Sequence, residues 1–244
     1  MSPEYLTALT LGIFIISMLY SSVGHAGASG YIAVMSLLSV APAAIKPIAL
    51  TLNILVATIG TWQFWRAGHF SWSLFWPFAV LSVPFAFVGG YLNLPTHLFK
   101  MLLGVILLYS AARFLLPAAI EKEPQVPARW QAVSAGGGIG FLSGLTGTGG
   151  GIFLTPLLLF MHWANIKSAA AVSALFILLN SIAGLLGTIS NTQTFPTFAL
   201  ILVVAAGTGG AIGSYYGSRR LAPLAIKRFL AVVLLIAGAK LLLT

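Results

Sequence analysis

The sequence predicts an all-α integral membrane protein, a polytopic bundle of helices. Hydrophobic residues make up 59% of the 244 residues and charged residues only 6%, and the mean hydropathy is +1.02. A chain of this composition cannot cover itself with a polar surface in water, so we expect the lipid bilayer to be its solvent. Apolar stretches recur along the whole chain and reach the length of about 20 residues that a membrane-crossing helix needs. The alternating ten-residue pattern of membrane strands is absent from the sequence.

Glycine, proline and charged residues divide the chain into ten expected helical pieces. About eight are long enough to cross a bilayer, and two are short and follow a glycine-rich break. In order, the expected helices span residues 4–23, 29–41, 44–66, 71–91, 95–116, 128–147, 150–161, 164–189, 195–217 and 222–243.

The second five pieces repeat the first five. Sliding the sequence by 121 residues places Gly30 on Gly151 and Ala49 on Ala170, and keeps the order of the pieces. The polar segment EKEPQVPARW lies between the copies and holds two of the three acids. We therefore expect one integrated membrane domain, made of a first transmembrane repeat (1–117), a cytoplasmic linker (118–128) and a second transmembrane repeat (129–244).

The basic residues favour two inverted repeats. If each glycine-rich break is a hairpin, the long helix and the short piece after it make no net crossing, so each repeat crosses three times. Nine basic residues then share one side with the linker: Arg66, Arg113, Lys122, Arg129, Lys167, Arg219, Arg220, Lys227 and Arg228. Three lie on the other side: Lys46, Lys100 and Lys240. Parallel repeats would split them five against seven, so the positive-inside rule favours inversion, with a cytoplasmic linker and both termini outside.

The net charge of +9 does not indicate a nucleic-acid partner in this setting. The basic residues stand singly or in pairs at the ends of segments, where they act as topology signals. The sequence has no cysteine, which excludes disulfides and thiolate metal sites. We expect no cofactor.

Two glycine-rich breaks mark the expected binding site. The first copy reads GHAGASGY and the second reads GLTGTGGG, with five glycines in eight residues. A helix N-terminus carries about half a positive charge and several unpaired N–H groups, and glycine lets a ligand approach that backbone closely. Two such N-termini near a pseudo-twofold axis predict an anion site. Close helix packing is the alternative role for these glycines.

The expected substrate-binding residues come from the two breaks. They are His25, Gly27, Ala28, Ser29, Gly30, Thr146, Gly147, Thr148, Gly149, Gly150 and Gly151. Backbone N–H groups would hold the anion, and the hydroxyls would add donors. His25 would hydrogen-bond an oxyanion or carry a coupling proton, or else serve as a packing histidine.

Four further residues are expected in vestibule or gating positions. Lys46 and Lys167 begin equivalent helices and would draw anions into opposite vestibules, the alternative being that they are interface lysines. Asn53 and Asn180 are the polar residues of the same two helices. The three acids fall at positions 4, 121 and 123, away from the expected membrane core, which disfavours cation transport. A sodium site built from hydroxyls, amides and carbonyls stays open, and so does a homodimer.

The second break and its flanks resemble a known family. The stretch GFLSGLTGTGGGIFLTPLLL, followed by IKSAAAVSALFILLNSIAGLLG, is similar to the signature of the sulfite exporter TauE/SafE family, also called the TSUP permeases. The resemblance covers essentially the whole chain and implies transport of small anions, such as sulfite, sulfonates and sulfoacetate, across a bacterial inner membrane. The first copy departs from the signature, because it has His25 and Ser29 where the second copy is mostly glycine.

We predict a secondary transporter for a small anion that works by alternating access and is not an enzyme. A passive anion or small-solute channel is one alternative, since it would use the same broken helices. An intramembrane serine protease is the other, because GASG (Gly27 to Gly30) fits the rhomboid nucleophile motif. That chemistry would need a histidine from another helix to activate Ser29.

Overall fold

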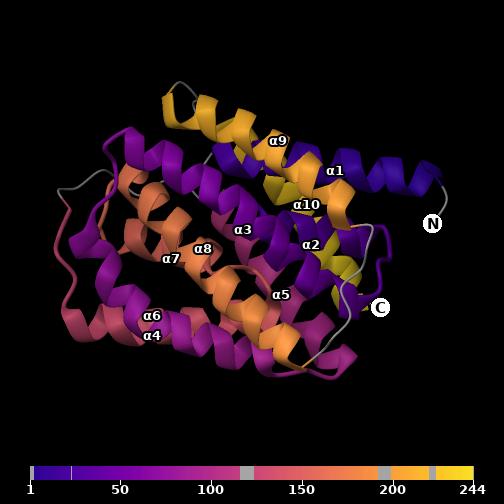
Figure 1. Cartoon of the computed structure of the whole chain (residues 1–244), viewed down its shortest axis with the longest axis horizontal. Helices are drawn as coiled ribbons and strands as arrows, with labels where there is room; N and C mark the ends of the chain where they lie inside the picture. Colours follow the sequence, from indigo (N-terminus) through magenta and orange to yellow (C-terminus); the bar gives the residue numbers. More distant parts are fainter. Residues whose placement is uncertain (1–2, 23, 116–123, 192–198, 220–223, 244) are drawn as a thin grey trace.

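The computed structural model describes residues 3–22, 24–115, 124–191, 199–219 and 224–243 (Figure 1). These residues form ten helices and no strand: α1 (Pro3–Ser22), α2 (Ala28–Leu37), α3 (Pro42–Arg66), α4 (Trp72–Tyr91), α5 (Thr96–Leu115), α6 (Arg129–Thr146), α7 (Gly151–Phe160), α8 (Ile166–Asn191), α9 (Ala199–Arg219) and α10 (Leu224–Leu243). The order and kind of the ten expected helices are confirmed. The expected helix 29–41 was too long, because the chain turns left-handed at Ser39 (φ 59°) and Pro42 opens the next helix.

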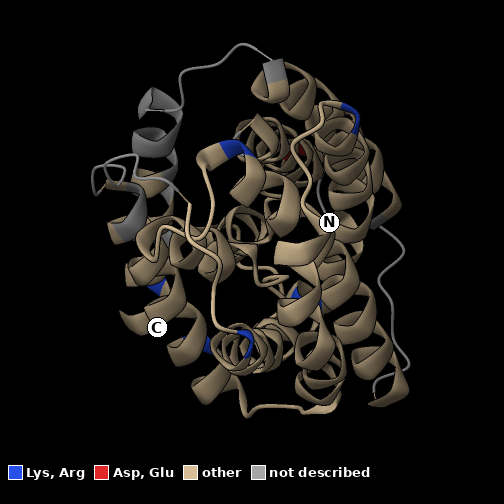
Figure 2. Cartoon of the chain, turned by 90° about the vertical axis from the view of Figure 1, so that its left-hand side faces the viewer, with Lys and Arg blue, Asp and Glu red and all other residues tan. Residues whose placement is uncertain are grey.

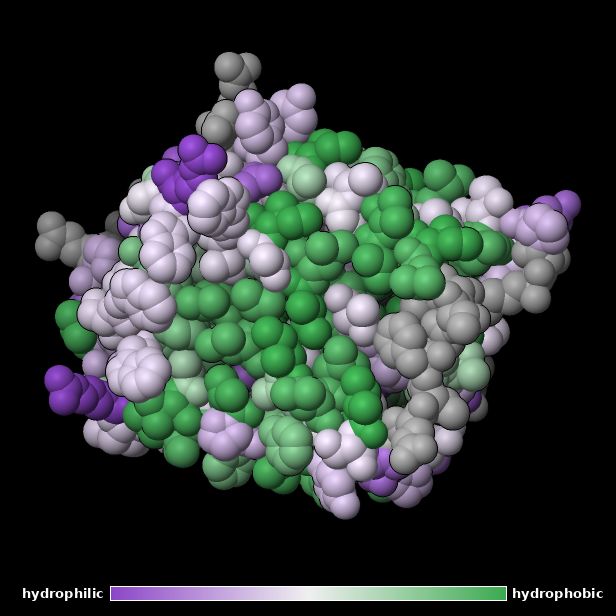
Figure 3. Space-filling model, viewed as in Figure 1, coloured by the Kyte–Doolittle hydropathy of each residue, from purple (hydrophilic) through white to green (hydrophobic). Residues whose placement is uncertain are grey.

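The outer surface is that of a membrane protein. Within the described residues, five helices are long and apolar enough to cross a bilayer by length and composition: α1, α3, α4, α8 and most of α9. Figure 3 shows a broad apolar band across the middle of one face, with hydrophilic residues at the two ends of the long axis. Trp62, Trp65, Trp72 and Trp76 are exposed around the α3–α4 connection, as an interfacial aromatic belt requires.

The helices form layers around a central pair (Figure 1). α1 and α9 lie along one edge, α4 and α6 lie along the opposite edge, and α3 and α8 run between them. α3 and α8 are the most buried of the candidate spans, with 61% and 67% of their apolar windows inside the protein. Both glycine-rich breaks therefore lie against a central crossing of α3 and α8.

Each break is a hairpin that returns the chain to the end where it started. The Tyr5 hydroxyl, near the start of α1, donates to the Leu38 carbonyl just after α2, at 2.8 Å. In the second copy the Gln125 N–H, ahead of α6, donates to the His162 carbonyl just after α7, at 2.7 Å. In each hairpin, the start of the long helix and the end of the short helix thus lie at the same end of the protein.

The two copies share a backbone signature at a spacing of 123 residues. Residues with positive φ recur as the pairs Gly24 and Gly147, Gly27 and Gly150, and Ser39 and His162. The 121-residue register, which paired Gly30 with Gly151, was therefore wrong by two residues in this region. The alignment was wrong because GTGGG contains several glycines that can be matched equally well, and only their backbone angles distinguish them.

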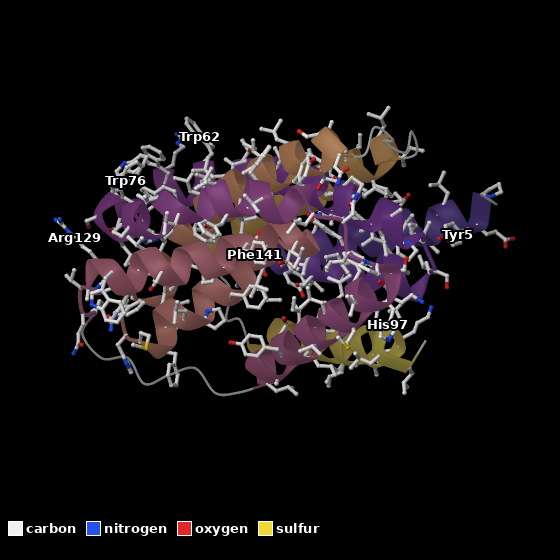
Figure 4. The ribbon with its side chains drawn as sticks, turned by 90° about the horizontal axis from the view of Figure 1, so that it is seen from below. Tyr5, Trp62, Trp76, His97, Arg129 and Phe141 are labelled. Atoms are coloured by element: carbon white, nitrogen blue, oxygen red, sulfur yellow. The ribbon has the colours of Figure 1, made fainter. Side chains whose placement is uncertain are left out.

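The contacts between helices also repeat from one half of the chain to the other. Replacing each helix by the one five places later turns the α1–α9 contact into α6–α4, and α3–α9 into α8–α4. At residue level, Gly60 of α3 faces Ala174 of α8, and Gly184 of α8 faces Leu50 of α3. Equivalent positions of α3 and α8 are therefore 124 residues apart. Figure 4 places Tyr5, near the start of α1, and Arg129, at the start of α6, at opposite ends of the long axis. The repeats are therefore inverted.

Glycine stripes join the outer helix pairs. On α6, Gly136, Gly140 and Gly144 lie against the backbone of α4 at Phe78, Ser82 and Ala86. On α9, Gly209, Gly213 and Gly217 lie in the same way against Phe14, Met18 and Ser22 of α1. This small-xxx-small spacing lets backbones approach closely in a membrane. The packing role weighed for glycine is therefore present at these outer helix pairs.

The basic residues are scattered at the ends of the molecule. Figure 2, which faces the end that carries Arg129, shows Lys and Arg as separate positions among uncharged residues. On the opposite end, Lys240 donates to the Ser36 and Leu37 carbonyls at 3.0 and 2.9 Å, so it caps the C-terminus of α2. Lys122, Arg220 and the linker residues 118–123 lie outside the described residues.

We predict that Gly140→Ala destabilises the protein while Gly138→Ala does not. A Cβ on Gly140 would lie 2.6 Å from the Ser82 Cα and Oγ, whereas a Cβ on Gly138 of the same helix meets nothing within 4 Å. Overpacking against backbone costs about 1–3 kcal/mol, so the melting temperature of detergent-purified Gly140→Ala should fall. Equal melting temperatures for the two variants would show that α4 and α6 can separate without cost.

Candidate functional site

The two breaks need glycine because of their backbone angles. α2 and α7 each follow a left-handed glycine, Gly27 at φ 107° and Gly150 at φ 82°. The second break has two more, Gly147 at 80° and Gly149 at 75°. L-residues rarely adopt such angles, so the chain can turn back sharply here only with glycine. The turns bring α2 and α7 to start deep inside the protein.

Both short helices begin at one enclosed cavity. Its walls are formed by the first break, the second break and the central helices: Tyr20, His25, Ala26, Gly27, Ala28, Ser29, Asn53, Thr148, Ile152 and Ile177. Three pairs of these residues are equivalent in the two repeats: His25 with Thr148, Ser29 with Ile152, and Asn53 with Ile177. The cavity therefore lies on the pseudo-twofold axis, as an inverted-repeat transporter site would.

The cavity is closed in this conformation. It leaves about 10 Å³ for the centre of a water-sized sphere, which is room for about one water molecule. A sulfur oxyanion is larger than that. Binding therefore requires the hairpins or the central helices to move apart.

The N-termini of α2 and α7 each bring a partial positive charge to the cavity, while α1 and α6 end at the same two breaks. Neither α2 nor α7 has a side-chain N-cap, in contrast to α8, where Asn165 Oδ1 accepts from the Ser168 N–H at 2.8 Å. Most first-turn N–H groups of α2 and α7 lack an intrahelical acceptor, although the Phe153 N–H of α7 donates to the Gly150 carbonyl at 3.0 Å, and each helix N-terminus acts as about half a positive charge. Among the described residues no Lys, Arg, Asp or Glu lines the cavity. The fixed partial charges there come from the backbone.

Several polar side chains converge on the cavity. The Ser29 hydroxyl donates to the Tyr20 hydroxyl at 3.0 Å, and His25 packs edge-on against the Tyr20 ring with centroids 6.4 Å apart. Thr148 pairs with Thr146 through hydroxyls 3.0 Å apart. These groups are all buried, so their polarity is directed inside the protein and not at lipid.

Some expected site residues have a packing role instead of lining the cavity. Gly30 lies against Ile16 and Tyr20, and Gly151 lies against Ile177, so both fit helices together. Gly147 ends α6 beside Lys46, and Gly149 and Gly150 form the turn behind Thr148. Thr146 closes the last turn of α6 by donating to Leu142 at 2.7 Å.

The two lysines expected in vestibule positions lie in different settings. Lys46 is buried, and its Nζ donates to the carbonyls of Gly89, Gly90 and Leu92 at 3.3, 2.8 and 3.3 Å, which caps α4. Lys167 is exposed at the start of α8, at the other end of the molecule. Burial, and then the charge of Lys167, lower the pKa of His69 in the α3–α4 connection.

The two asparagines also differ. Asn53 lines the cavity, whereas Asn180 lies outside its lining and accepts from the Ser82 hydroxyl at 2.7 Å. Sequence reasoning missed Ala26 of the first break as a lining residue, and also Tyr20, Ile152 and Ile177. No local signal marks the latter three, because they sit in uniformly apolar helices whose facing side depends on the fold.

A second cavity lies on the Arg66 side of the first. It is lined by Ser21, Gly24, His25, Ala26, Val56, Ala57, Gly60, Phe64 and Ala174. His25 and Ala26 line both cavities, so the first break forms the wall between them. Phe64 packs with Ala170 and Ala171 to close the outer end. The two cavities mark a line from the central site toward the end that carries Arg66.

The chain is similar in sequence to known membrane transporters. A family model described as "Sulfite exporter TauE/SafE" matches residues 9–241. "Probable membrane transporter protein y4hK" of Sinorhizobium fredii is 41% identical over 240 residues, which covers 96% of this chain and 97% of that protein.

Two more distant relatives match part of the chain. "Probable membrane transporter protein YunE" of Bacillus subtilis is 31% identical over 104 residues, 43% of this chain and 38% of that protein. "Probable membrane transporter protein MJ0441" of Methanocaldococcus jannaschii is 30% identical over 132 residues, 52% of this chain and 49% of that protein. No solved structure matches the chain.

The family match spans both hairpins, both central helices and the cavity between them. The chain is thus a member of the sulfite exporter TauE/SafE family of membrane transporters.

Proposed function

We propose that this protein is a secondary transporter that carries sulfite or a sulfur-containing organic anion, such as a sulfonate or sulfoacetate, across the bacterial inner membrane. The observation that carries the proposal is the meeting of two uncapped helix N-termini at one cavity on the pseudo-twofold axis. Buried N–H groups of this kind are suited to an anion. The name of the matching family supports sulfite as the first substrate to test.

The charge inventory supports an anion over a cation. Glu4 lies at the outer end of α1, and the other two acids are at positions 121 and 123 in the polar segment. A buried cation beside two helix N-termini would have no carboxylate to offset their field. Coupling to a proton at His25 or to sodium is a separate question that flux measurements under defined gradients would answer.

Closure of the site at both ends supports alternating access as the mechanism. On the Arg66 side the site is closed by Phe64 with Ala170 and Ala171, and on the other side by Lys46 against Gly147. Because inverted repeats can exchange conformations, opening one closure while keeping the other gives the two access states. We place the protein as a multi-pass protein with the linker in the cytoplasm, and leave a homodimer to be tested by its mass in detergent.

The first prediction is saturable uptake of radiolabelled sulfite by proteoliposomes that contain the full-length protein. Unlabelled sulfonates should compete, and preloaded unlabelled anion should accelerate uptake by counterflow, because a carrier exposes one site to both sides in turn. Flux that rises linearly with concentration would indicate a channel. Peptide cleavage by the protein, lost in Ser29→Ala, would instead support the protease.

Replacing the N-cap of α7 should abolish transport. In Gly150→Val the side chain would meet Phe176 at 2.9 Å on a backbone at φ 82°, so the second break cannot keep its shape. We expect uptake per folded protein to fall by at least about tenfold, since loss of one transition-state or binding contact of 1.4 kcal/mol already has that effect. Gly138→Val on exposed α6 surface is the matched control. Normal uptake by a folded Gly150→Val protein would remove the second break from the site.

The Ser29 hydroxyl is expected to contribute to affinity. A hydrogen bond to a charged group is worth about 1.5–3 kcal/mol, so Ser29→Ala should raise the half-saturation concentration at least about tenfold. Ser110→Ala is the control, because Ser110 is also buried but donates only to Ile106 within α5. A change of equal size in both variants would point to a general loss of stability, which a melting curve would reveal.

A further inference from the structure

The second cavity and the equivalent place on the Lys46 side are packed differently. The residues of the other repeat that correspond to its lining are Gly144, Gly147, Thr148, Gly149, Asn180, Ser181, Gly184, Thr188 and Leu50. Gly60 borders the cavity, and a Cβ there would lie 3.9 Å from Ala174. A Cβ on the equivalent Gly184 would lie only 3.3 Å from the Gly144 Cα, so α6 and α8 are in tight contact. One position of the fold is thus open in the first repeat and closed in the second.

The two equivalent places also differ in polarity. Val56, Ala57 and Phe64 beside the second cavity correspond to Asn180, Ser181 and Thr188 in the closed place. The three polar residues are all buried. Polar side chains are costly inside a membrane protein and often mark the path of a substrate. Because only one repeat carries them, the general packing of the fold does not require them.

The Asn180 amide has donors to offer. Asn180 is fully buried on α8, and its Oδ1 accepts from the Ser82 hydroxyl of α4 at 2.7 Å. Its Nδ2 has no hydrogen-bond partner within the described residues. A buried donor without a partner costs free energy, so its presence calls for an explanation. A ligand that reaches Asn180 in another conformation would supply the missing acceptor.

Donors also close the outer end of this place. The Lys46 Nζ and the Thr188 hydroxyl both donate to the Gly90 carbonyl of α4, at 2.8 and 3.1 Å. Their equivalents in the other repeat are Ala170 and Phe64, which pack against each other without polar contact. A solute that passes on the Lys46 side therefore meets groups that can donate to it, whereas on the other side it meets apolar surface.

In an inverted-repeat carrier the repeats exchange conformations, so the place around Gly184 opens when the cavity around Gly60 closes. We propose that this opening is an anion-binding vestibule, in which the Asn180 amide donates to a small oxyanion on its way between the Lys46 end and the central cavity. N–H and hydroxyl donors and a lysine all stabilise negative charge. On the opposite side Val56 stands in place of Asn180, and the path is mostly apolar. The inference rests on the proposed function, because it adds a second station for the same substrate.

Single cysteines test the vestibule, because the chain has no cysteine of its own. Ser181→Cys places a thiol there, and Ala57→Cys is the matched control at the equivalent position beside the second cavity. The full-length variants in membranes are labelled with an anionic sulfonatoethyl and a cationic trimethylammonioethyl methanethiosulfonate, each rate being divided by that of a small thiol in solution. The anionic reagent should be favoured at least about tenfold at position 181 and less than about threefold at position 57.

The side of labelling is a second readout of the same variants. Both reagents are too polar to cross a bilayer, so positions 181 and 57 should react from opposite sides of the membrane, in intact cells and in inverted vesicles. Labelling of both positions from one side would overturn the vestibule. So would an unreactive position 181 in a folded protein whose position 57 reacts.

Asn180→Val, added to Ser181→Cys, tests the amide itself. Valine is the residue that the other repeat has at this position, so the backbone can accommodate it. The preference for the anionic reagent should fall about tenfold, while the rate with the cationic reagent stays the same. Thr155→Val is the control, because Thr155 is buried and donates to Ser173 of α8 but lines neither cavity. An unchanged preference in folded Asn180→Val would overturn the role of the amide, and Thr188→Cys replaces Ser181→Cys if that variant does not fold.

Flux measurements on the same protein in proteoliposomes separate this inference from the proposed function. Sulfoacetate that slows the labelling of position 181, and that is also carried across the membrane, supports both. Charge-selective labelling at position 181 without flux of any sulfur oxyanion would keep the vestibule and reject the transporter. Saturable anion flux with equal normalised rates for the two reagents at position 181 would keep the transporter and reject the vestibule.

Discussion

The structure depends on one constraint: a helix that breaks inside a bilayer must bury its freed backbone groups in protein. Lipid offers no hydrogen bonds, so irregular backbone at membrane depth is tolerated only where protein or a polar cavity surrounds it. Residues 24–30 and 143–151 are buried throughout. The central crossing of α3 and α8, the most buried spans, supplies that cover. Each repeat therefore needs both a hairpin with a broken helix and a central helix that covers the break.

The shielding in turn explains where glycine is used. Gly27 and Gly150 supply left-handed turns, whereas Gly140 and Gly213 have ordinary helical angles and let helices touch backbone to backbone. Without such contacts at α4–α6 and α1–α9, the long helix of each hairpin would stand off from its partner. Because there is little hydrophobic drive between helices in lipid, close packing is what holds these pairs. Glycine thus stabilises the outer helix pairs α4–α6 and α1–α9, and it also shapes the two breaks.

Sequence reasoning reached the helices because their ends are marked locally by proline, glycine and charge. It also located both breaks, since GTGGG cannot continue a helix. The register of the repeats could not be predicted, because several glycines align equally well. The spacing becomes visible only in the positive φ angles of Gly24, Gly27 and Ser39 and of the equivalent residues in the second repeat. Lys46 reads as a vestibule lysine, yet its three carbonyl partners come from α4, more than 40 residues away. Contacts between distant segments leave no local trace in a single sequence.

The two repeats have equivalent backbones but different side chains where they close the site at its two ends. Position 46 of α3 and position 170 of α8 are equivalent, and each packs on the glycine that ends the long helix of the opposite repeat. At one end this residue is Lys46, which holds three carbonyls at the end of α4; at the other it is Ala170, which packs with Phe64. Opening the first end must expose or replace charged hydrogen bonds, whereas opening the second exposes only apolar surface. In the alternating-access carrier that we propose, the two access states are related by exchanging the repeats, so this difference in side chains makes their free energies differ. The second cavity lies on the side closed only by apolar contacts, where less has to be broken.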